Sequence, residues 1–576
     1  MRFLFALSMM VPLAATARAQ NIIGTRDSLT SRVDSIFRTF DRTDAPGCAI
    51  GVYRDGRILY ARGYGMANLE LGVPITPRTA FNIESVTKQF TATAVLLLEQ
   101  EGKLSLDDPI SRYFPEMPPY ASGITVRQML QHTSGLREVW WLSILAGRSF
   151  EFDTVDVLRL ITRSAETSFP PGTRHAYSNS GFILAGQLVY RLSGQSLGAF
   201  LRERVFDPLG MDDTRLPDDP TLIIPGRAEG YSTRGDEFRN TREGLGFGLG
   251  NSNLQTTIED FVRWDRNWDS PTVGGRALVE SLVVPGPHPK EETWRPGLGV
   301  FVATYRGLRT VGHSGEGDGF ISAYLRFPDQ KFSVACFCNV YTANAWGLAQ
   351  AVATVYLSAE MAPDESGESG VWSTALRGEP AVSLSVEELR RFEGVWYSAE
   401  RGQIRRTRMK GDTLTYVASW SPTPIPLVPL GGNRFRTRNG GAEFVFEAED
   451  TERPKRMQVT SGSGTQIGVW EAMDSLEQLT AAKLAEYAGE YRSEEIEATY
   501  RIATDNDHLV IRIFGGPRLG TVEPTWRDAF GLWGEDGGTD LTGALFQFTR
   551  DGSGRITGFD IQVGSYVRNL SFIRQP

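Results

Sequence analysis

A long, mostly apolar run ends close to residue 100. Residues 84–102 read ESVTKQFTATAVLLLEQEG, with polar side chains in the first turn and an uncharged, mostly apolar stretch at residues 90–98. A helix that is apolar on every side belongs in a protein core. We therefore predict a buried helix here. The serine and lysine of its first turn need partners or a function to offset the cost of their burial.

Alternating apolar and polar positions predict strands on both sides of this helix. Residues 47–65 contain two apolar runs around Asp55 and Gly56, a pair typical of a tight β-hairpin turn. Residues 308–339 have the pattern of three further strands, with a turn at Pro328. These segments predict a sheet whose strands come from both ends of one domain.

Helical patterns occupy much of the chain between and after these strands. Residues 105–245 alternate helical periodicity with loops rich in proline and glycine, which favours a mainly helical insert. Residues 256–268 predict a helix with Thr257 as N-cap, and residues 343–361 predict a closing helix. We expect an α+β fold in which distant segments complete one antiparallel sheet.

The pattern changes after residue 361. Residues 362–382 have the composition of a linker. Beyond them, short alternating strands follow two related segments, LSVEELRRFEGVWY and LTAAKLAEYAGEYR. Their matching residues lie 95 positions apart: Leu384 and Leu479, Leu389 and Leu484, Phe392 and Tyr487, Gly394 and Gly489, Trp396 and Tyr491. The repeat predicts two small antiparallel β-barrel modules, each opened by a short helix.

Length and charge limit the possible domain organisation and the possible partners. A chain of 576 residues is too long for one hydrophobic core. We divide it into a first domain at residues 20–361, the linker, and barrel modules at residues 383–473 and 474–576. The formal net charge is −9 and no long basic run is present, so we expect no nucleic-acid partner.

The first residues have the composition of a secretion signal. Arg2 precedes a mostly apolar stretch that extends to residue 15, and residues 17–19 read ARA, a small-x-small cleavage site. A membrane anchor is the alternative, but the stretch is short for a bilayer and contains Pro12. We expect a signal peptide at residues 1–19, no membrane span after cleavage, and export to the periplasm or the medium.

The three cysteines are Cys48, Cys336 and Cys338. Cys336 and Cys338 lie two apart in a predicted strand, on one face but poorly placed to bridge each other. An exported chain of this size needs no disulfide for stability, so we expect buried thiols. A bridge from Cys48 to either of the other two remains open. Neither the cysteines nor the histidines have metal-ligand spacing, and we expect no metal site.

Ser85 and Lys88 lie three residues apart at the start of the apolar helix and so share one of its faces. A serine hydroxyl is a weak nucleophile and needs an adjacent base. A lysine can act as that base when burial favours its neutral form. The N–H groups at the start of the helix suit an oxyanion that forms at the serine. The chain contains no other Ser-x-x-Lys.

Tyr177 and Asn179 form a second polar element, where a Pro-Pro-Gly loop leads into Tyr-Ser-Asn before a helical pattern. A tyrosine here can relay a proton between the serine and a leaving group. An asparagine can bind a substrate amide. The structural alternative is a loop tyrosine that packs its ring, beside an asparagine that caps the helix.

His313, Ser314 and Gly315 form a third element, within a predicted strand. Glycine in a strand often marks the close approach of a ligand. The histidine can bind a substrate anion or polarise Tyr177, and its structural alternative is a partly buried strand residue. No nucleotide-binding glycine motif has a suitable strand–helix context.

In chain order, Ser-x-x-Lys, Tyr-x-Asn and His-x-Gly resemble the active-site motifs of serine hydrolases related to class C β-lactamases, D-alanyl-D-alanine peptidases and D-aminopeptidases. The stretches LSLDDPISRYFPEMP, ITVRQMLQHTSGL and FDPLGMDDT are also similar to that family. The resemblance covers roughly residues 28–360. It implies an antiparallel sheet flanked by helices that meets an all-helical region, with the active site between them.

The resemblance also implies catalytic roles. Ser85 would be the nucleophile and Lys88 its base. Tyr177 would carry protons to the leaving group and help to activate the deacylating water. His313 would stand where many β-lactamases have a lysine. The backbone N–H groups of Ser85 and Glu316 would form the oxyanion hole. The reaction would be acyl transfer through an ester on Ser85, followed by hydrolysis, and would require no cofactor.

The same resemblance makes Asn179, Ser314 and Gly315 substrate-binding residues. Two positions depart from the family pattern, because Glu84 and Glu316 stand where small residues are usual. Their carboxylates can repel an anionic substrate or bind a substrate amine, and both hypotheses remain open.

Within the family, His-x-Gly and the two barrels favour a peptidase or amidase that acts on peptides containing D-amino acids. D-aminopeptidases of the family use a loop of the last barrel to select a free amino terminus, and residues 513–543 are the candidate here. The barrels can instead brace the first domain or bind cell-wall glycan. An esterase or a β-lactamase is the alternative activity, acting on an ester or a β-lactam. A non-catalytic penicillin-binding sensor is the alternative of another class, which the intact motif set disfavours.

Overall fold

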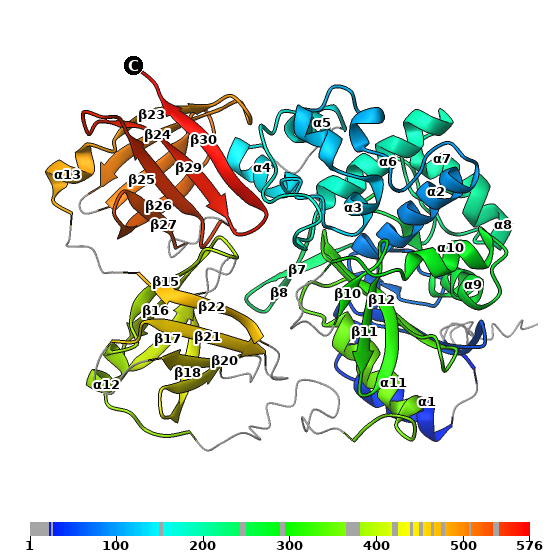
Figure 1. Cartoon of the computed structure of the whole chain (residues 1–576). Helices are drawn as coiled ribbons and strands as arrows, with labels where there is room; N and C mark the ends of the chain where they lie inside the picture. Colours follow the sequence, from blue (N-terminus) through cyan, green and yellow to red (C-terminus); the bar gives the residue numbers. More distant parts are fainter. Residues whose placement is uncertain are drawn as a thin grey trace, which may run out of the picture.

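The computed structural model places a domain of helices and sheet beside two β-barrels (Figure 1). The predicted signal peptide and residues 364–380 of the predicted linker lie outside the described residues. The described residues are 22–24, 27–148, 154–219, 221–241, 249–287, 294–363, 381–417, 424–437, 442–447, 453–461, 466–473, 479–505, 508–533 and 541–576.

The first domain is built on an antiparallel sheet to which both ends of the domain contribute. Its strands, in sheet order, are β1 (Ile22–Ile23), β3 (Arg57–Tyr64), β2 (Cys48–Arg54), β14 (Phe332–Cys338), β13 (Phe320–Phe327), β12 (Leu308–Gly317), β11 (Phe301–Tyr305) and β10 (Arg295–Pro296). The predicted hairpin is β2 and β3. At its turn, Asp55 and Gly56 have φ angles of 53° and 67°, the left-handed conformation that such turns require. The three predicted later strands are β12, β13 and β14.

Helices cover both faces of this sheet. α1 (Ser28–Ile36) and α11 (Ala345–Leu357) share a buried core with one face. α9 (Ile258–Asp269) packs against β2 and β3 on the other. The side chain of Thr257 caps α9 by accepting a hydrogen bond from the N–H of Asp260, as the sequence predicts.

A helical region lies beside the sheet, in the upper right of Figure 1. The apolar helix is α2 at its centre, entered through a 3₁₀ turn. The region and its surroundings contain η3 (Glu84–Thr87), α2 (Lys88–Gln100), η4 (Ile110–Arg112), η5 (Pro119–Gly123), α3 (Val126–Leu130), α4 (Val139–Ala146), α5 (Thr154–Thr162), α6 (Asn179–Ser193), α7 (Leu197–Leu201), the π-helical turn η6 (Arg202–Phe206), α8 (Asp207–Leu209) and α10 (Gly275–Leu282).

Three short two-stranded sheets complete the domain. They are β4 (Met66–Asn68) with β5 (Val73–Pro74), β6 (Phe81–Asn82) with β9 (Gln255–Thr256), and β7 (Tyr231–Arg234) with β8 (Glu237–Asn240). The β7–β8 hairpin corrects the expectation of a mainly helical insert up to residue 245. Its turn contains Gly235 with φ 62°, a signal that the periodicity of the longer segments hid.

Two closed antiparallel barrels follow, as predicted. Each opens with a short helix, α12 (Val386–Arg390) or α13 (Ala481–Ala485). The first barrel has strands β15 (Gly394–Ser398), β16 (Gln403–Lys410), β17 (Thr413–Val417), β18 (Ile425–Gly431), β19 (Arg434–Thr437), β20 (Ala442–Glu447), β21 (Arg456–Ser461) and β22 (Gln466–Ala472). The second has β23 (Gly489–Ser493), β24 (Ala498–Asp505), β25 (His508–Ile513), β26 (Arg518–Trp526), β27 (Ala529–Leu532), β28 (Leu545–Arg550), β29 (Ile556–Val563) and β30 (Val567–Arg574).

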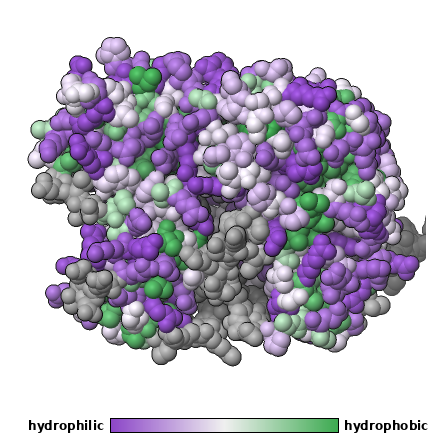
Figure 2. Space-filling view, in the orientation of Figure 1, coloured by the Kyte–Doolittle hydropathy of each residue, from purple (hydrophilic) through white to green (hydrophobic). Residues whose placement is uncertain are grey.

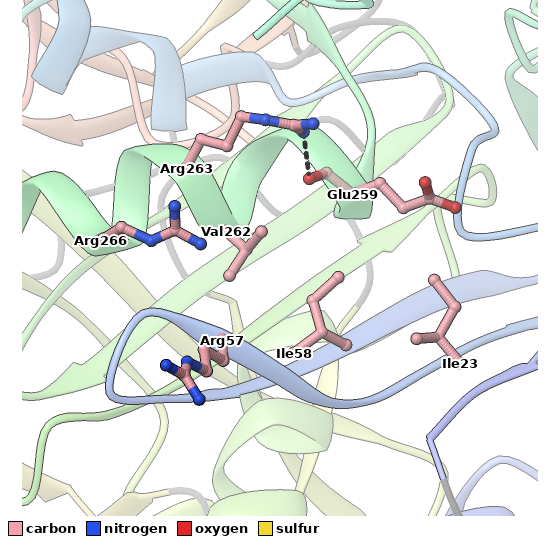
Figure 3. A pocket seen from close by; sticks show the side chains of 7 residues that line it. All are labelled: Ile23, Arg57, Ile58, Glu259, Val262, Arg263 and Arg266. Carbon is pink, nitrogen blue, oxygen red and sulfur yellow. Dashed lines mark hydrogen bonds between the residues drawn. The ribbon is translucent and has the colours of Figure 1, made fainter. Parts of the chain in front are cut away.

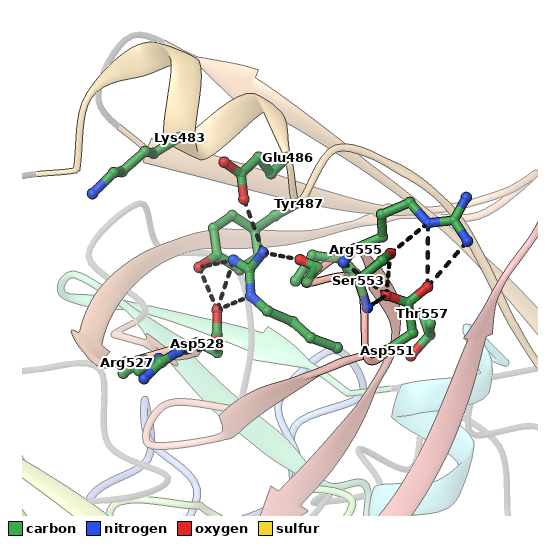
Figure 4. Close-up of polar contacts among 12 residues, drawn as sticks. Lys483, Glu486, Tyr487, Arg527, Asp528, Asp551, Ser553, Arg555 and Thr557 are labelled. Carbon is green, nitrogen blue, oxygen red and sulfur yellow. Dashed lines mark hydrogen bonds and ion pairs between the residues drawn. The ribbon is translucent and has the colours of Figure 1, made fainter.

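The repeated residues occupy equivalent places in the two barrels. Trp396 and Tyr491, one repeat apart, are both fully buried in their barrel cores. In the second barrel, Tyr487 donates a hydrogen bond of 2.7 Å to Asp528 (Figure 4). Arg550 bonds to both residues. This closed network fixes the end of the short helix to the barrel wall.

The second barrel is docked firmly on the helical region, with β30 beside α4 in Figure 1. Its hydrophobic core is continuous with that of the first domain. The fully buried Arg137 forms an ion pair with Glu495. Glu497 forms ion pairs with three further arginines: Arg148, Arg159 and Arg163. The second barrel and the helical region therefore form one packed unit.

Cys48 and Cys338 face each other on β2 and β14 and form a disulfide, while Cys336 is a buried free thiol. The expectation of three thiols was therefore wrong for two of them. Strand pairing across a sequence separation of 290 residues brings the two cysteines together, and no local pattern reveals that pairing.

The surface in Figure 2 is mostly hydrophilic, with hydrophobic residues in small separate groups. Among the described residues, no helix is long and apolar enough to cross a membrane.

Candidate active site

Ser85 lies in the 3₁₀ turn η3, immediately before α2. The preceding residue, Glu84, has a left-handed φ of 47°, unusual for a residue with a long side chain. The carboxyl of Glu84 accepts a 2.6 Å hydrogen bond from the Asn82 side chain. The backbone N–H of Glu84 donates to the Asn82 side-chain oxygen at 2.9 Å. These bonds hold the strained turn that presents Ser85.

Lys88 begins α2 and is completely buried. Its Nζ lies 2.9 Å from Oγ of Ser85, 2.9 Å from Oδ1 of Asn179 and 2.8 Å from the carbonyl oxygen of Asn251. Burial lowers the pKa of Lys88 to about 7, against the opposing effect of Glu138 and Glu84. Near neutral pH, a large fraction of Lys88 is therefore neutral and able to accept the Ser85 proton.

Tyr177 lies over the same pair, with the Lys88 Nζ 4.9 Å from the centre of its ring. Burial raises the pKa of Tyr177 above its usual range, while the nearby Ser85 hydroxyl opposes that rise. The phenol therefore keeps its proton at neutral pH. Tyr177 can donate that proton to the leaving group of a substrate that reacts with Ser85.

His132 holds the Tyr177 loop in place. Its ring stacks on Tyr177 with centroids 4.4 Å apart, and its Nδ1 accepts a 2.9 Å hydrogen bond from the N–H of Ser178. Its carbonyl oxygen accepts a further bond from the N–H of Ala176. Burial lowers the pKa of His132 well below its usual range, so the neutral ring that these contacts require is favoured. The sequence analysis missed this residue.

Asn179 is the first residue of α6 and links Lys88 to Glu138. Its Oδ1 accepts from Lys88, and its Nδ2 donates to Glu138 at 3.0 Å. The N–H of Asn179 donates to the other Glu138 oxygen at 2.6 Å. Asn179 therefore positions the base, and both ends of its side chain are engaged before any substrate amide binds. Glu138 was also missed, although it directly follows the HTSGLR segment.

His313 lies on β12 with its ring 6.0 Å from that of Tyr177 and 4.9 Å from that of Phe301. Its Nδ1 lies 2.5 Å from the carbonyl oxygen of Ser314, which assigns the proton to Nδ1. Burial lowers the pKa of His313 to about 3, with Lys88 adding to the effect. A neutral ring cannot attract a substrate anion by charge, and Nε2 of His313 is buried with no hydrogen-bond partner among the described residues, so the ring can offer the substrate a neutral polar contact there.

Gly315 allows β12 to approach the nucleophile turn. A Cβ atom at this position would lie 2.4 Å from the carbonyl oxygen of Ile83 and 2.8 Å from Cβ of Glu84. This close contact brings the backbone at Glu316 towards Ser85. Ser314 and Glu316 are exposed on the same strand.

Glu84 and Glu316, the two residues that depart from the family pattern, differ in burial. The Glu84 carboxyl is buried, and a Cβ atom at Gly317 would lie 2.7 Å from Oε2 of Glu84. Burial raises the pKa of Glu84 to about 8, with Asp318 adding to the rise. Glu84 is therefore mostly uncharged at neutral pH, and Glu316 is the carboxylate left exposed to a substrate.

The second barrel reaches this site through the turn between β29 and β30. The carbonyl oxygen of Tyr566 accepts hydrogen bonds of 3.0 Å from the N–H of Glu138 and from Oγ of Ser168. The phenol of Tyr566 lies close enough to contribute to the raised pKa of Tyr177. The sequence analysis did not single out this turn.

The predicted loop at residues 513–543 is only partly described. Residues 534–540 lie outside the described residues, and most of the rest forms strands β26 and β27 and their turns. At its start, Ile513 packs against Gly147 of the helical region.

A separate cavity of about 390 Å³ lies between β3 and α9 (Figure 3). Arg57, Arg263, Arg266 and Glu259 line it over an apolar floor, and its lining within the described part of the chain contains no serine, cysteine, histidine or lysine. Arg263 donates to the carbonyl oxygen of Glu259, and Arg266 donates to that of Gly56. The catalytic group at Ser85 is therefore a different site.

The family model described as Beta-lactamase matches residues 33–368, more than half of the chain. The chain belongs to the Beta-lactamase family. Within this family it is a serine hydrolase, and the matched range contains Ser85, Lys88, Tyr177 and His313.

Relatives of this Beta-lactamase-family chain extend through its barrels. It is 27% identical over 496 residues to a D-aminopeptidase of Gluconobacter oxydans, covering 85% of this chain and 86% of that protein. It is 25% identical over 537 residues to a D-aminopeptidase of Brucella canis, covering 91% and 94%.

Solved structures share its fold. A penicillin-binding protein homologue from Pyrococcus abyssi, described as octameric, has a TM-score of 0.53 at 19% identity, covering 84% of this chain and 98% of its own. The D-amino acid amidase from Ochrobactrum anthropi SV3 has a TM-score of 0.51 at 24% identity, covering 58% and 100%.

Proposed function

We propose that this serine hydrolase is a D-aminopeptidase or amidase, which removes an amino-terminal D-amino acid from a small peptide or amide. The observation that carries the proposal is the Ser85 group, in which a buried lysine and a protonated tyrosine converge on one accessible serine. The D-aminopeptidases similar to this chain support the substrate class, because their similarity includes the barrels as well as the catalytic domain.

Acylation begins when neutral Lys88 takes the proton of Ser85. The serine oxygen attacks the substrate carbonyl carbon, and a C–O bond forms. The backbone N–H groups of Ser85 and Glu316 stabilise the oxyanion. As the C–N bond breaks, Tyr177 donates a proton to the departing amine, and Lys88 returns a proton to Tyr177.

Deacylation repeats these steps with water. Tyr177 and Lys88 take a proton from the water as it attacks the ester carbon. The ester C–O bond breaks, and Ser85 regains its proton as the D-amino acid leaves. The chain's own residues supply every group in this sequence, and it requires no cofactor.

The test is hydrolysis by the purified protein with Ser85→Ala as control. The substrates are D-alanine and L-alanine p-nitroanilide, p-nitrophenyl butyrate and a chromogenic cephalosporin. We expect turnover of the D-anilide above the L-anilide, lost in Ser85→Ala. Turnover of only the ester or only the cephalosporin would replace the proposal with an esterase or a β-lactamase. Activity that survives Ser85→Ala would overturn the assignment of the nucleophile.

We also propose that the protein is exported to the periplasm or secreted. The amino-terminal pattern supports export, and so does the Cys48–Cys338 disulfide, because disulfides persist in oxidising compartments. Mass spectrometry of the protein from a secreting bacterial host should give a mature chain that starts at Gln20. An intact amino terminus in the cytoplasmic fraction would contradict this.

A further inference from the structure

Glu84 directly precedes the nucleophile, yet it has no part in the proton transfers of Ser85, Lys88 and Tyr177. Its residue is only 5% exposed. Its backbone has a φ of 47°, a left-handed conformation that glycine adopts readily and a residue with a long side chain does not. Such a conformation persists only where the surrounding contacts hold it, and it is often part of a functional site. The contacts of Glu84 therefore indicate its role.

Asn82 fixes the position of Glu84 through two hydrogen bonds. Nδ2 of Asn82 donates to Oε1 of Glu84 at 2.6 Å, and Oδ1 of Asn82 accepts from the backbone N–H of Glu84 at 2.9 Å. Nδ2 of Asn82 also donates to Oδ1 of Asn253 at 2.9 Å. All three residues are buried. The Glu84 carboxyl is therefore held in one place, and its Oε2 is left to contact β12.

The Glu84 side chain lies against β12 on both sides of Glu316. A Cβ atom at Gly317 would lie 2.7 Å from Oε2, 2.8 Å from Cδ and 3.0 Å from Oε1 of Glu84, the nearest atoms that it would meet in the described structure. A Cβ atom at Gly315 would lie 2.8 Å from Cβ of Glu84. Residues two apart on a strand face the same way, so both glycines present bare backbone to this side chain. Glu84 therefore limits how closely β12 approaches the turn of Ser85.

In the proposed mechanism, Glu316 supplies the second backbone N–H of the oxyanion hole. β11 pairs with β12 only as far as Gly312, so from His313 onward one edge of β12 has no strand partner in the described part of the chain. An oxyanion donor acts only at the correct distance from the developing charge. A small displacement of β12 relative to Ser85 would therefore lower kcat.

The Glu84 side chain can support β12 without opposing the reaction, because it is mostly uncharged. Burial raises the pKa of Glu84 to about 8, with Asp318 and Glu316 adding to the rise and Lys88 opposing it. A buried carboxylate beside the hole would repel the oxyanion, whereas a protonated carboxyl does not.

We propose that Glu84 is a positioning residue of the oxyanion hole: its side chain, fixed by Asn82, is the support that places the backbone N–H of Glu316 relative to Ser85. This inference rests on the proposed function, because it uses the oxyanion hole of that mechanism. The length of the side chain is then what matters, and its charge is not. Gly317 has no left-handed φ, so the Glu84 carboxyl is the closest obstacle to a side chain there.

Two substitutions of Glu84 separate length from charge. Glu84→Gln keeps the length and can accept the Asn82 bond. Glu84→Asp keeps the carboxyl and tolerates a left-handed φ, but it is one methylene shorter. On D-alanine p-nitroanilide, Glu84→Gln should keep most of kcat, and Glu84→Asp should lower kcat by at least about tenfold, less than the loss of one oxyanion donor causes. KM should change little, because the contact strengthens in the transition state.

Gly317→Ala tests the contact itself. Alone, it should lower kcat, because its methyl group would lie 2.7 Å from Oε2 of Glu84. In a protein that also carries Glu84→Gly, the same substitution should cause little further loss, since the carboxyl is gone and glycine suits a φ of 47°. Gly315→Ala is the matched control. Its methyl group would lie 2.4 Å from the carbonyl oxygen of Ile83, so its loss of kcat should remain in the Glu84→Gly protein.

Three results would overturn the inference alone: wild-type kcat in Glu84→Asp, a loss in Glu84→Asp that is confined to KM, or a loss in Gly317→Ala of the same size with and without Glu84→Gly. The melting temperature of each variant is measured beside its kinetics. The Gly317 comparison decides if Glu84→Asp fails to fold.

Failure of the proposed function gives a different result. If the wild type hydrolyses only p-nitrophenyl butyrate or only the cephalosporin, the assigned substrate class is wrong. The same variants are then compared on that substrate, because its reaction also forms an oxyanion at Ser85. The kcat ratios still support or overturn the role of Glu84.

Discussion

Nζ of Lys88 lies 2.9 Å from Oγ of Ser85, at the first turn of a helix that leaves Lys88 no exposed surface. This burial makes the lysine a base, because desolvation disfavours the charged ammonium more than Glu138 and Glu84 together favour it. The same apolar helix that forms the core of the domain therefore also sets the chemistry of its first turn.

Activity should rise with pH through the titration of Lys88. Because its pKa is about 7, kcat/KM for D-alanine p-nitroanilide should increase from pH 5 to pH 8 with a midpoint near 7. Lys88→Met should lower kcat/KM by at least about 1000-fold, as loss of a catalytic base does in related mechanisms. A wild-type profile that is flat between pH 5 and pH 8 would contradict the role of Lys88 as base.

The same burial of Lys88 should lower the free energy of unfolding at neutral pH. Its folded pKa of about 7 lies below its unfolded value near 10.5, so the unfolded state binds more protons between these limits. This destabilisation of the folded state has its full value below pH 7 and decreases as the pH rises towards 10.5. Lys88→Met should therefore raise the melting temperature more at pH 6 than at pH 10. An equal shift at both pH values would contradict the lowered pKa.

Glu138 should tune the base through its charge. It raises the pKa of Lys88, so Glu138→Gln should move the acidic limb of the pH–rate profile to lower pH by about half a unit to one unit. Glu84→Gln is the matched comparison. Because the pKa of Glu84 is about 8, this carboxyl is mostly protonated where the limb lies, and its replacement should shift the limb less. Equal shifts of the limb in the two variants would contradict the larger effect of the Glu138 charge on the pKa of Lys88.

The ion pair of Arg137 and Glu495 should hold the second barrel to the catalytic domain. Glu495→Gln removes the nearer of the two carboxylates that pair with the fully buried Arg137 and leaves only Glu166, at 3.6 Å; breaking such a buried pair costs about 3 kcal/mol. We expect a lower melting temperature and a lower kcat, because Arg137 directly precedes Glu138. Glu494→Gln removes the adjacent carboxylate, which pairs with the exposed Arg492, and is the control. A Glu495→Gln protein as stable and active as this control would show that the pair is not needed for docking.

The disulfide of Cys48 and Cys338 should stabilise the sheet. It closes a loop of 290 residues, and the loss of such a constraint costs about 3–5 kcal/mol. Cys48→Ala with Cys338→Ala should therefore lower the midpoint of urea unfolding, and reduction of the wild type should give a similar change. Cys336→Ala is the control and should respond to a reductant as the wild type does. Insensitivity of the wild type to reduction would contradict the bridge.

Local patterns predicted most of the fold. The hairpin at Asp55 and Gly56, the capped helix after Thr257 and the 95-residue barrel repeat each depend on neighbouring residues, and each is present. The β7–β8 hairpin was missed because a short strand pair at the edge of a helical region leaves only a turn signal. Buried thiols were favoured over the disulfide, which was left as an open alternative, because its pairing depends on strand register across most of the domain.

The sequence by itself determined the chemical types at the site. Ser85, Lys88, Tyr177, Asn179 and His313 stand in recognisable local motifs, and the structure brings them together.

Only the tertiary structure decided the protonation states of these groups and the residues that surround them. The lowered pKa of Lys88, the neutral ring of His313 and the engagement of Asn179 by Glu138 all follow from burial and from partners far along the chain. Tyr566 reaches the site from a barrel turn that shares no motif with it. A sequence pattern records which side chains are adjacent along the chain, but desolvation and charge depend on what surrounds them in space.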